Sequence, residues 1–401
     1  MKIIKAKFIV VCDDKFNILK NHAVLFDENI RRIIPQNQIY KFGDCEIFDC
    51  NDSILMPHFI NTHTHLEYSA NQASLEYGDF LSWVKSVIVS RDELTSPKNK
   101  TAMQNALKTM IKSGVGTVGE ISSFGVDLDL FDKSGIRVVF FNEILGSNLA
   151  KFDEICANFT QRFNKSMAKK SDNFIPAISI HSPYSTNPKI AEFAINLAKE
   201  HNLIISTHFL ESKAELKWLK DANGEFKDWL KNFILSPKPF YSPKSYIKQF
   251  SGLRTLFTHC VWAEKYFDLF DKNLHFITHC PRSNRLLSEK FLDISKIDVN
   301  IGTDGLSSNY NLNFWDELRA GLFVNSEFDL QKLAKKLIIS ATKNAALALN
   351  LPSGEIKPGN LADFALYPLI DCKNSDQFAL SMILHTNYCQ KLFIKGNQCN
   401  F

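Results

Sequence analysis

The clearest pattern in the chain is a series of short apolar runs, separated by longer stretches in which apolar residues recur at helical spacing. Each run has the length of a buried strand. The first run leads to His63, and the others lie at 116–121, 136–144, 175–181, 203–208, 254–260, 274–280 and 298–304. Repeated strand-helix alternation predicts parallel βαβ units. Eight such units predict a closed (β/α)8 TIM-like barrel, with a doubly wound open sheet as the alternative.

Both ends of the chain follow a different pattern. Short extended runs at 3–12, 23–26, 30–34 and 45–50 are punctuated by Asp, Asn and Gly, which predicts a small antiparallel sheet. Runs at 362–367 and 391–395 would complete that sheet. We therefore expect a small β-sandwich built from residues 1–56 and 351–401, attached to a barrel of residues 57–350.

The segment 212–252 is too long for a plain connection between a barrel strand and its helix. Its aromatic residues include Trp218, Phe226, Trp229, Phe240 and Tyr241. Long insertions after barrel strands commonly cover the active mouth. A helical hairpin that packs its own aromatics has the same composition, so the sequence leaves open whether this segment contacts a ligand.

Composition excludes several classes of protein. The chain has 401 residues, of which 47 are basic and 43 acidic, and the two signs are interspersed, unlike the basic stripe of a nucleic-acid binder. No apolar stretch approaches the ~20 residues of a membrane span, so we expect a cytoplasmic protein without a membrane partner. Nine cysteines without a C-x-x-C pair argue against a disulfide framework and a structural zinc cluster. The lack of a Gly-rich phosphate loop disfavours kinases and dinucleotide enzymes.

Histidines gather at the ends of the predicted strands. His63 and His65 end the first strand, the fourth to seventh strands end in further histidines, and the eighth ends in Asp304. The further histidines are His181, His208, His259 and His279. In a barrel these ends lie at one mouth, where active sites are built. A lone His-x-His pair is readily explained by local packing, but a histidine at so many strand ends favours a metal site.

Three imidazoles and a carboxylate from these ends form a ligand set suited to one divalent ion, Zn²⁺ or Fe²⁺, with a position left for water. The set is His63, His65, His208 and Asp304. A metal held in this way lowers the pKa of a water toward neutrality and supplies a nucleophile. The predicted reaction class is metal-assisted hydrolysis or hydrolytic deamination.

Proton transfer is assigned to Glu211, which lies three residues beyond His208 and would act as general acid and base. The alternative for Glu211 is a first-turn helix acid stabilised by the helix dipole. We expect His259 to hydrogen-bond the nucleophile and His181 to touch the substrate. Neighbouring backbone groups could instead hold either histidine.

Several motifs can be compared with known families as an ordered set. They are P-x-F-I-N-x-H-x-H at 57–65, H-S-P-Y-S at 181–185, T-H-x-x-E at 207–211, T-H-C at 258–260, H-C-P-R-S-N at 279–284, G-T-D-G at 302–305 and G-E-I-K-P-G-N-L-A-D at 354–363. The set resembles the amidohydrolase superfamily, and more closely its branch of chlorohydrolases and adenosine-type deaminases. The resemblance implies a mononuclear site with Glu211 as proton shuttle and with His259 and Asp304 orienting the nucleophile.

Substrate preference rests on the same kind of comparison. The runs H-T-H-L-E-Y-S-A-N at 63–71 and C-P-R-S-N-R-L-L-S at 280–288 look like those of the aminofutalosine deaminases of menaquinone biosynthesis. This implies conversion of 6-amino-6-deoxyfutalosine to futalosine and ammonia. In S-adenosylhomocysteine-type deaminases a Glu before a Trp holds the ribose hydroxyls, whereas here Ser82 precedes Trp83. We expect the loop that contains Glu67 and Trp83 to decide which purine nucleoside is accepted.

The benzoate of that substrate needs a cationic partner. Arg282 and Arg285, just after the seventh strand, are candidates for a bidentate clamp, with solvated positions at a helix start as the alternative. Other activities stay open: deamination of adenosine, 5′-methylthioadenosine, S-adenosylhomocysteine or guanine, a chlorohydrolase, or a metal-free barrel scaffold. We expect a small-molecule purine nucleoside and no nucleic acid as partner, and a homodimer is compatible with the sequence.

Overall fold

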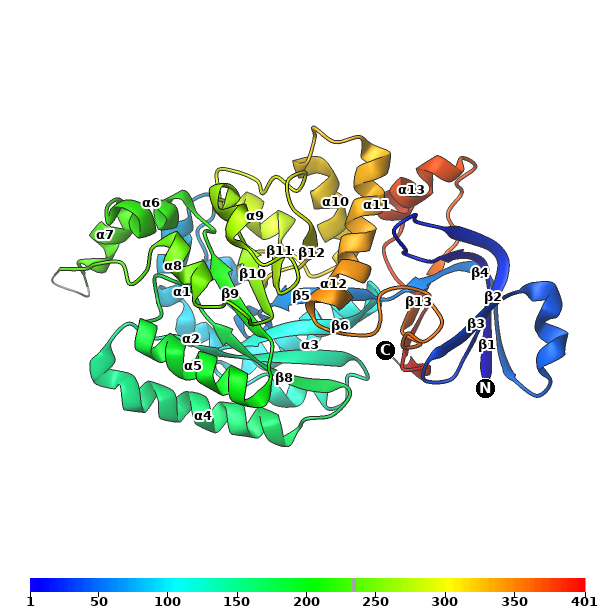
Figure 1. The fold of residues 1–401 in the computed structure, drawn as a ribbon, viewed down its shortest axis with the longest axis horizontal. Coiled ribbons are helices and arrows are strands. Elements are labelled where there is room, and N and C mark those ends of the chain that lie inside the picture. The colour runs from blue at the N-terminus through cyan, green and yellow to red at the C-terminus, as the bar shows by residue number, and fades with distance from the viewer. Residues whose placement is uncertain (233–235, 401) are drawn as a thin grey trace.

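The structure is a computed structural model that describes residues 1–232 and 236–400 (Figure 1). Within these residues, eight parallel strands form the core in unbroken spatial order from β12 to β5. They are β5 (Phe59–Thr64), β6 (Val115–Ser122), β7 (Arg137–Ile144), β8 (Phe174–Ile180), β9 (Ile205–Phe209), β10 (Thr255–His259), β11 (His275–His279) and β12 (Val299–Ile301). Sequential order excludes the doubly wound alternative, in which the strand order reverses. The predicted barrel is confirmed.

The barrel is completed where its last strand meets its first. The backbone N–H groups of Thr303 and Asp304, just after β12, donate to the carbonyl of His63 in β5 at 3.1 and 3.0 Å. The Thr62 hydroxyl also donates to the carbonyl of Ile301 at 3.0 Å. These bonds bring the first and last strand ends together, although they are far apart in the sequence.

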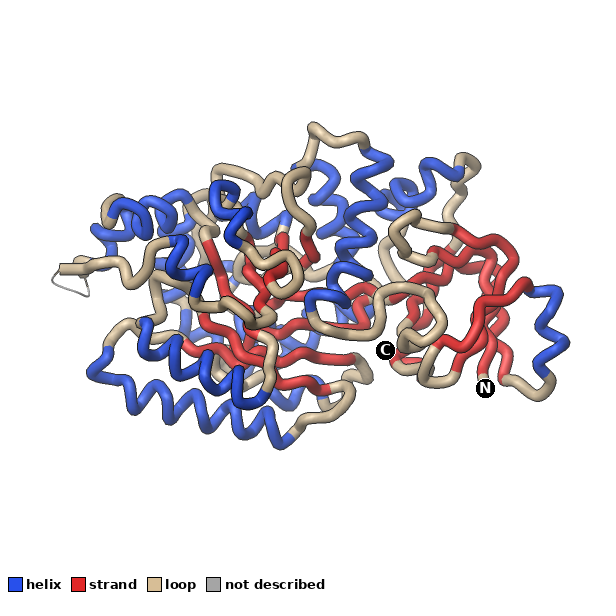
Figure 2. The backbone as a smooth tube through the Cα atoms, in the orientation of Figure 1, coloured by secondary structure: helices blue, strands red, loops and turns tan. Residues whose placement is uncertain are grey.

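Helices surround the barrel strands (Figure 2). The α-helices of the described residues are α1 (Phe80–Val89), α2 (Arg91–Leu94), α3 (Pro97–Lys112), α4 (Phe152–Ala168), α5 (Pro188–His201), α6 (Lys213–Asp221), α7 (Glu225–Leu230), α8 (Pro243–Lys248), α9 (Pro281–Leu287), α10 (Phe314–Val324), α11 (Leu330–Ala341), α12 (Lys343–Ala348) and α13 (Phe378–His385). Short 3-10 helices are η1 (Gln36–Phe42), η2 (Leu66–Tyr68), η3 (Gln72–Ser74), η4 (Leu128–Phe131), η5 (Leu149–Lys151), η6 (Glu264–Leu269) and η7 (Ser375–Gln377). No helix in the described part of the chain is both long and apolar enough to cross a membrane.

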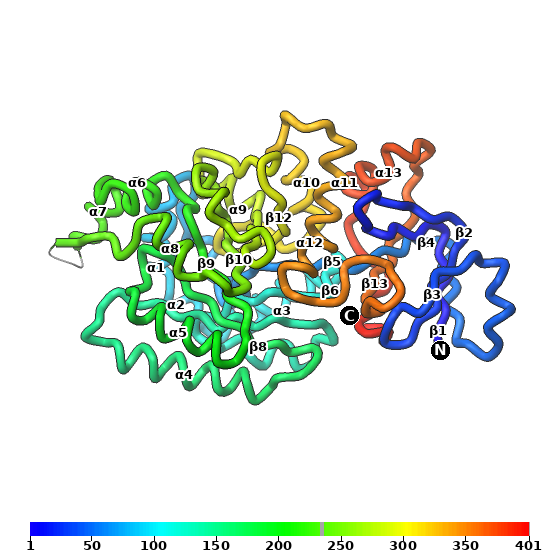
Figure 3. Tube along the Cα trace, in the orientation of Figure 1, coloured from blue at the N-terminus to red at the C-terminus, as the bar shows by residue number. Residues whose placement is uncertain are grey.

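Both ends of the chain form a separate sheet beside the barrel, as expected. Its strands, in spatial order within the described residues, are β15 (Asn397–Cys399), β14 (Lys391–Ile394), β13 (Phe364–Pro368), β4 (Glu46–Pro57), β1 (Lys2–Val10), β2 (Ile18–Phe26) and β3 (Ile30–Pro35). Figure 3 follows the chain from the blue N-terminal strands through the barrel to the red C-terminal strands at the same side of the molecule.

One expectation for this sheet is wrong, because the sheet is mixed and not purely antiparallel. Strands β1, β2 and β3 do pair antiparallel in a meander, but β4 runs parallel to β1 with Lys2 opposite Glu46. The chain passes from β3 through η1 before it enters β4. This connection returns the chain to the starting end of β1, which a tight hairpin cannot do.

A buried ion pair joins the sheet to the barrel. Asp363, next to β13, accepts a hydrogen bond from the Arg137 guanidinium at 2.6 Å, and the His58 ring lies 3.5 Å from the same carboxylate. His58 is the single residue between β4 of the sheet and β5 of the barrel. The chain passes between the barrel and the sheet near residues 58 and 363. The junction therefore connects both of these passages to Arg137, the first residue of β7.

Candidate active site

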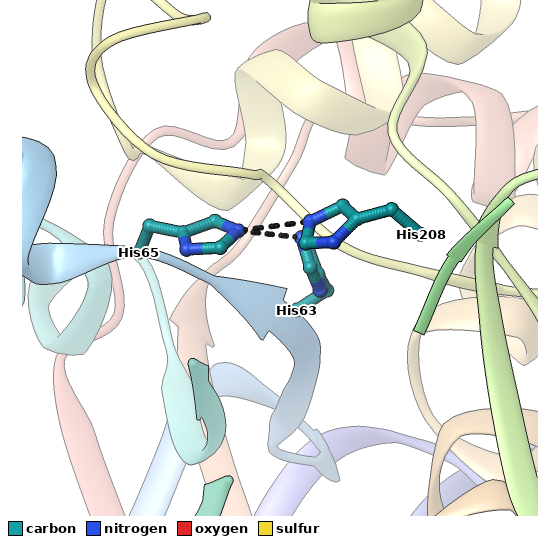
Figure 4. Close-up of side chains that lie close together, drawn as sticks. All are labelled: His63, His65 and His208. Atoms are coloured by element: carbon teal, nitrogen blue, oxygen red, sulfur yellow. Dashed lines mark hydrogen bonds between the residues drawn. The ribbon is translucent and has the colours of Figure 1, made fainter. Parts of the chain in front are cut away.

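Three imidazoles converge at the carboxyl end of the barrel strands (Figure 4). The Nε2 atom of His65 lies 3.1 Å from Nε2 of His63 and 3.1 Å from Nε2 of His208. His63 comes from β5, His65 follows that strand, and His208 comes from β9. Residues two apart in a strand face the same side, which explains why the His-x-His pair points inward together.

The protonation of these rings suits metal binding. The Nδ1–H of His208 donates to the backbone carbonyl of His181 at 2.9 Å, so its Nε2 is left with a lone pair. Burial, reinforced by neighbouring imidazoles, lowers the pKa of His63 and of His208 well below the ordinary value. Three imidazole nitrogens that lie this close together are typical of a site that binds a metal ion. The donor set therefore fits a divalent metal ion.

Asp304 supplies the carboxylate of the set. Its Oδ1 lies 3.7 Å from Nε2 of His65 and 3.8 Å from Nε2 of His63. Burial alone would raise the pKa of Asp304, but the adjacent imidazoles of His65, His259 and His63 and the Ser283 hydroxyl lower it below its usual range. The carboxylate is therefore ionised, which is the form that can bind a metal ion.

The two glycines of the G-T-D-G motif allow this approach. A Cβ at Gly302 would lie 2.8 Å from the Cβ of His63, and a Cβ at Gly305 would lie 2.8 Å from the carbonyl oxygen of His65. Side chains at these positions would push the β5 and β12 ends apart. Glycine is required here because two ligand-bearing backbones approach each other closely.

Left-handed backbone occurs at several of the strand ends. Positive φ angles are found at Leu210 (47°), His259 (71°), Cys260 (51°) and Asp304 (57°). Such conformations cost a non-glycine residue on the order of 1–3 kcal/mol and concentrate at functional sites. Each of these residues is, or directly adjoins, Glu211, His259 or Asp304.

Glu211 lies beside these groups with its carboxyl buried. Its Oε1 is 3.6 Å from Nε2 of His259. Burial raises the pKa of Glu211 well above its ordinary value, and the negative charges of Asp304 and Glu215 add to the shift. The shift of Glu211 favours its protonated form, whereas that of Asp304 favours its ionised form. Two nearby carboxyl groups with opposite shifts can act as acid and base.

Glu215, not Glu211, is the first-turn acid of α6. The Ser212 hydroxyl caps the helix by accepting the N–H of Glu215 at 3.1 Å. The carboxylate of Glu215 accepts the backbone N–H of Leu210 at 3.0 Å and that of Glu211 at 2.9 Å. This arrangement fixes the backbone that carries Glu211.

A hydrogen-bonded chain sets the tautomer of His259. The Nδ1–H of His259 donates to Oδ1 of Asn284 at 2.8 Å, and Nδ2 of Asn284 donates to Nδ1 of His279 at 3.1 Å. Burial lowers the pKa of His279 to about 3, so this ring stays neutral and accepts. Nε2 of His259 is left as an acceptor that faces Asp304 Oδ2 at 3.8 Å.

These groups open into a cavity of about 240 Å³. His65, His208, Glu211, His259 and Asp304 line its inner part. The rest of the lining is mostly apolar and comes from α1, from α7 and from loops after the strands. It includes Phe80, Trp83, Val84, Val87, Ile88, Leu145, Tyr184 and Trp229. Among the described residues that line the cavity, none is a lysine or an arginine.

Two of the predicted substrate contacts lie in the cavity wall. Trp83 lines it and donates its indole N–H to the Ser307 carbonyl at 2.8 Å. His181 also lines it, with Nδ1 hydrogen-bonded to the Ser185 hydroxyl at 2.5 Å. Trp229, from the insertion 212–252, lines the cavity as well, although residues 233–235 of that insertion lie outside the described residues.

The other three predicted substrate contacts do not line the cavity. Glu67 is fully buried and accepts the backbone N–H groups of Ser123 and Phe124 at 2.6 and 2.7 Å, so it organises the loop after β6. Arg282 is buried against Glu317 at 2.6 Å. Arg285 is exposed on α9. A guanidinium clamp therefore has no support from the placement of either arginine.

Some residues of the site escaped sequence reasoning. Asn284 and Ser283 lie in the H-C-P-R-S-N run, which was used only for family comparison. Pro281 marks the start of α9, and this helix start after a barrel strand is the signal that could have pointed to the two residues. Glu215 could have been predicted from Ser212, because a Ser followed three residues later by a Glu is typical of a helix N-terminus. Glu143, also in the cavity wall, has no local signal beyond its place near the end of a strand.

The chain is similar to known proteins over nearly its whole length. The model of the amidohydrolase family matches residues 54–399. The aminodeoxyfutalosine deaminase of a Nitratiruptor species is 40% identical over 405 residues, which cover 99% of each chain. A Helicobacter pylori protein named adenosine deaminase is 35% identical over 410 residues, again 99% of each chain.

Among solved structures, that of Helicobacter pylori aminofutalosine deaminase in complex with methylthio-coformycin superimposes with a TM-score of 0.93. It is 35% identical, and the match covers 99% of this chain and 100% of the other. The similarity extends over the barrel and the terminal sheet together.

Proposed function

The chain belongs to the amidohydrolase family, and on that premise we propose that it is a metal-dependent deaminase that converts 6-amino-6-deoxyfutalosine to futalosine and ammonia. The observation that carries the proposal is the joint arrangement of the cavity. Residues that could hold one metal ion line it, together with Glu211, a buried carboxyl whose pKa is raised well above its ordinary value. An apolar, largely aromatic wall leads away from them toward α1.

His63, His65, His208 and Asp304 would hold the metal ion, Zn²⁺ or Fe²⁺. When bound, such an ion lowers the pKa of a water molecule and makes it a nucleophile near neutral pH. Asp304 then accepts the proton that the attacking water loses, and Nε2 of His259 accepts a hydrogen bond from that water. Both groups are suited to this because Asp304 is ionised and burial lowers the pKa of His259.

Glu211 donates a proton to the substrate, whereas Asp304 accepts one from the water. As a protonated acid it donates to the ring nitrogen next to the reacting carbon while water adds to that carbon. Of the two protons that the water loses, one passes to the departing amine, which leaves as ammonia, and the other returns to Glu211 and restores its acid form. Both transfers occur in a water-poor site, where pre-placed charges act strongly.

The apolar wall suits the aryl end of the proposed substrate. Trp83, Val87, Ile88 and Trp229 offer contact area for a benzoate ring beyond the sugar. The lining described above contains no cation, so the benzoate carboxylate is expected to point toward solvent at the cavity mouth. Adenosine itself would leave much of this wall uncovered.

The test is deamination by the purified protein of 6-amino-6-deoxyfutalosine, 5′-methylthioadenosine, S-adenosylhomocysteine, adenosine and guanine, followed by absorbance. We expect the highest kcat/KM for the first of these. A higher value for any other would assign the enzyme to that substrate, and no turnover of any of them would refute the deaminase proposal. Metal analysis of the same preparation should find about one Zn²⁺ or Fe²⁺ per chain.

A broader deaminase of 5′-substituted adenosines is the second candidate. An apolar wall accepts a methylthio group as well as an aryl group, since both gain from burial of apolar surface. The two candidates differ in the ratio of kcat/KM between 6-amino-6-deoxyfutalosine and 5′-methylthioadenosine. A homodimer and a cytoplasmic location remain predictions, to be tested by light scattering and cell fractionation.

A further inference from the structure

Glu143 is a buried carboxylate in the cavity wall for which the chemistry above has no use. It lies near the end of β7 and is 2% exposed. Its Oε2 accepts a hydrogen bond from the Ser123 hydroxyl at 2.5 Å. Its Oε1 is buried, and no group in the described residues hydrogen-bonds it. An acceptor left bare in this way is costly unless a ligand supplies the donor.

The position of Glu143 is deep in the cavity and not at its rim. A carboxylate oxygen of Glu143 and ring nitrogens of His181 and His208 all lie within 4.8 Å of one another. When the reacting carbon of a substrate lies at the metal ligands, the Glu143 carboxylate is therefore close to the group that is attached to the reacting ring.

A second metal ion does not explain this cluster. Nδ1 of His208 is already committed to the carbonyl of His181, and its Nε2 faces Nε2 of His65 at 3.1 Å. That leaves one nitrogen of His181 and one carboxylate, which is fewer than the three protein ligands that even catalytic zinc sites provide.

Other acids near the cavity are committed elsewhere. Glu67 is saturated by backbone N–H groups, and Asp79 caps α1 by accepting the N–H of Ser82 at 2.8 Å. Glu211 and Asp304 belong to the proton transfers. Among the described residues that line the cavity, Glu143 is therefore the carboxylate left for binding the substrate.

Resting on the proposed function, we propose that Glu143 binds the ribose hydroxyls of the nucleoside and thereby makes the enzyme selective for ribonucleosides. A nucleoside whose amino group lies at the metal site offers few further donors. The vicinal 2′- and 3′-hydroxyls are neutral donors on the ring attached to the purine, and a carboxylate accepts such donors strongly. The Ser123 hydroxyl holds the carboxylate in place through its other oxygen.

The test compares Glu143→Gln with wild type on 6-amino-6-deoxyfutalosine and on its 2′-deoxy and 3′-deoxy forms. For the wild type, loss of the contacted hydroxyl should lower kcat/KM by about 10- to 100-fold, as expected for a hydrogen bond to a charged group. Glu143→Gln should lose about as much on the ribonucleoside, mainly through KM, and should lose little on the deoxy form. Glu154→Gln, at an exposed position on α4, is the matched control and should behave as wild type.

Three results would overturn the proposal. An equal loss on the ribo and deoxy substrates, or a loss of bound metal, would mean that Glu143 acts on the site as a whole. Full activity of Glu143→Gln on the ribonucleoside would mean that Glu143 does not bind the ribose. If Glu143→Gln does not fold, Glu143→Asp replaces it in the same comparison of substrates. The shorter Asp side chain keeps the charge but moves the carboxylate away from the substrate. A wild-type enzyme inactive on 6-amino-6-deoxyfutalosine would refute the proposed function, which is a separate outcome.

Discussion

The pKa values of two carboxyl groups in the site are shifted in opposite directions because their neighbours differ. Asp304 lies among imidazoles and a hydroxyl, which stabilise its ionised form. Glu211 is buried with two acids as its charged neighbours, which stabilise its protonated form. His259 lies between the two carboxyls, 3.6 Å from Glu211 and 3.8 Å from Asp304. These opposite pKa shifts support the acid and base roles proposed for the two groups.

Replacement of Glu211 tests the acid role. Glu211→Gln keeps the shape of the side chain but removes the acidic proton, so we expect kcat to fall by about 10²- to 10⁴-fold while the metal is retained. Steady-state kinetics and metal analysis measure the two quantities. Glu225→Gln, at an exposed site on α7, is the control. Near-normal turnover of a metal-loaded Glu211→Gln enzyme would remove Glu211 from the mechanism.

Glu215 gives a prediction for stability against pH. Burial raises the pKa of Glu215 to about 7 from its ordinary value of 4.5. Between these pH values the folded state binds more protons than the unfolded state, so the contribution of Glu215 to the free energy of unfolding falls as pH rises.

The comparison is with Glu215→Gln, whose side chain does not titrate. Relative to wild type, the variant should gain stability as pH rises from about 5 to about 7, by up to ~1.4 kcal/mol per pH unit. Thermal unfolding midpoints of both proteins across this range provide the measurement. A difference that does not change with pH would show that Glu215 keeps one charge state throughout.

At the scale of elements, α1 forms one wall of the cavity and is held there by Trp83. The helix begins at Asp79, whose side chain caps it, and its apolar face supplies much of the wall. The indole N–H of Trp83 donates to the carbonyl of Ser307, in the loop after β12. This bond connects the loop after the first barrel strand with the loop after the last.

Trp83→Phe removes this bond but keeps an aromatic ring. We expect kcat/KM to fall by about 3- to 10-fold, since one net hydrogen bond is worth on the order of 1 kcal/mol. Trp262→Phe is the matched control, because the indole of Trp262 donates to the Ser288 hydroxyl away from the cavity. An equal effect of the two replacements would mean that the loss is general and not a property of α1.

For the whole molecule, the terminal sheet supports the barrel at the end opposite the site. Asp363 is ionised there because the charges and hydrogen bonds of His58 and Arg137 lower its pKa, although burial opposes them. Arg137 is 1% exposed, so its charge depends on this partner. The junction lies at the N-terminal ends of β5 and β7, and the catalytic groups lie at the C-terminal ends.

Asp363→Asn should therefore cost stability and leave the chemistry intact. Removal of one partner from a buried ion pair typically costs about 3–5 kcal/mol, because the remaining charge is uncompensated. We expect a clear fall in the thermal unfolding midpoint, with kcat of the folded enzyme close to wild type. Asp172→Asn, which breaks the exposed pair with Lys395, should change the midpoint little. A large loss of kcat in Asp363→Asn would show that the junction acts on the site.

The sequence by itself determined the barrel and the histidines at its mouth. Apolar periodicity is local, and parallel strands all end at one face, so a residue at a strand end can be placed without knowledge of the loops. The structure brings His63, His65, His208 and Asp304 together for this reason. The parallel pairing of β1 and β4 was missed because it depends on where a connecting segment leads.

Only the tertiary structure decided which side chains face the cavity from the loops. Glu67 and Arg282 looked available in the sequence, yet each is committed to a buried partner on another element. Glu143 carried no local signal, yet it lines the cavity, and one of its carboxylate oxygens has no hydrogen-bond partner among the described residues. These roles depend on hydrogen bonds between segments that are far apart in the sequence. Neither residue spacing nor composition predicts such bonds, because burial and pairing arise only once the chain is folded.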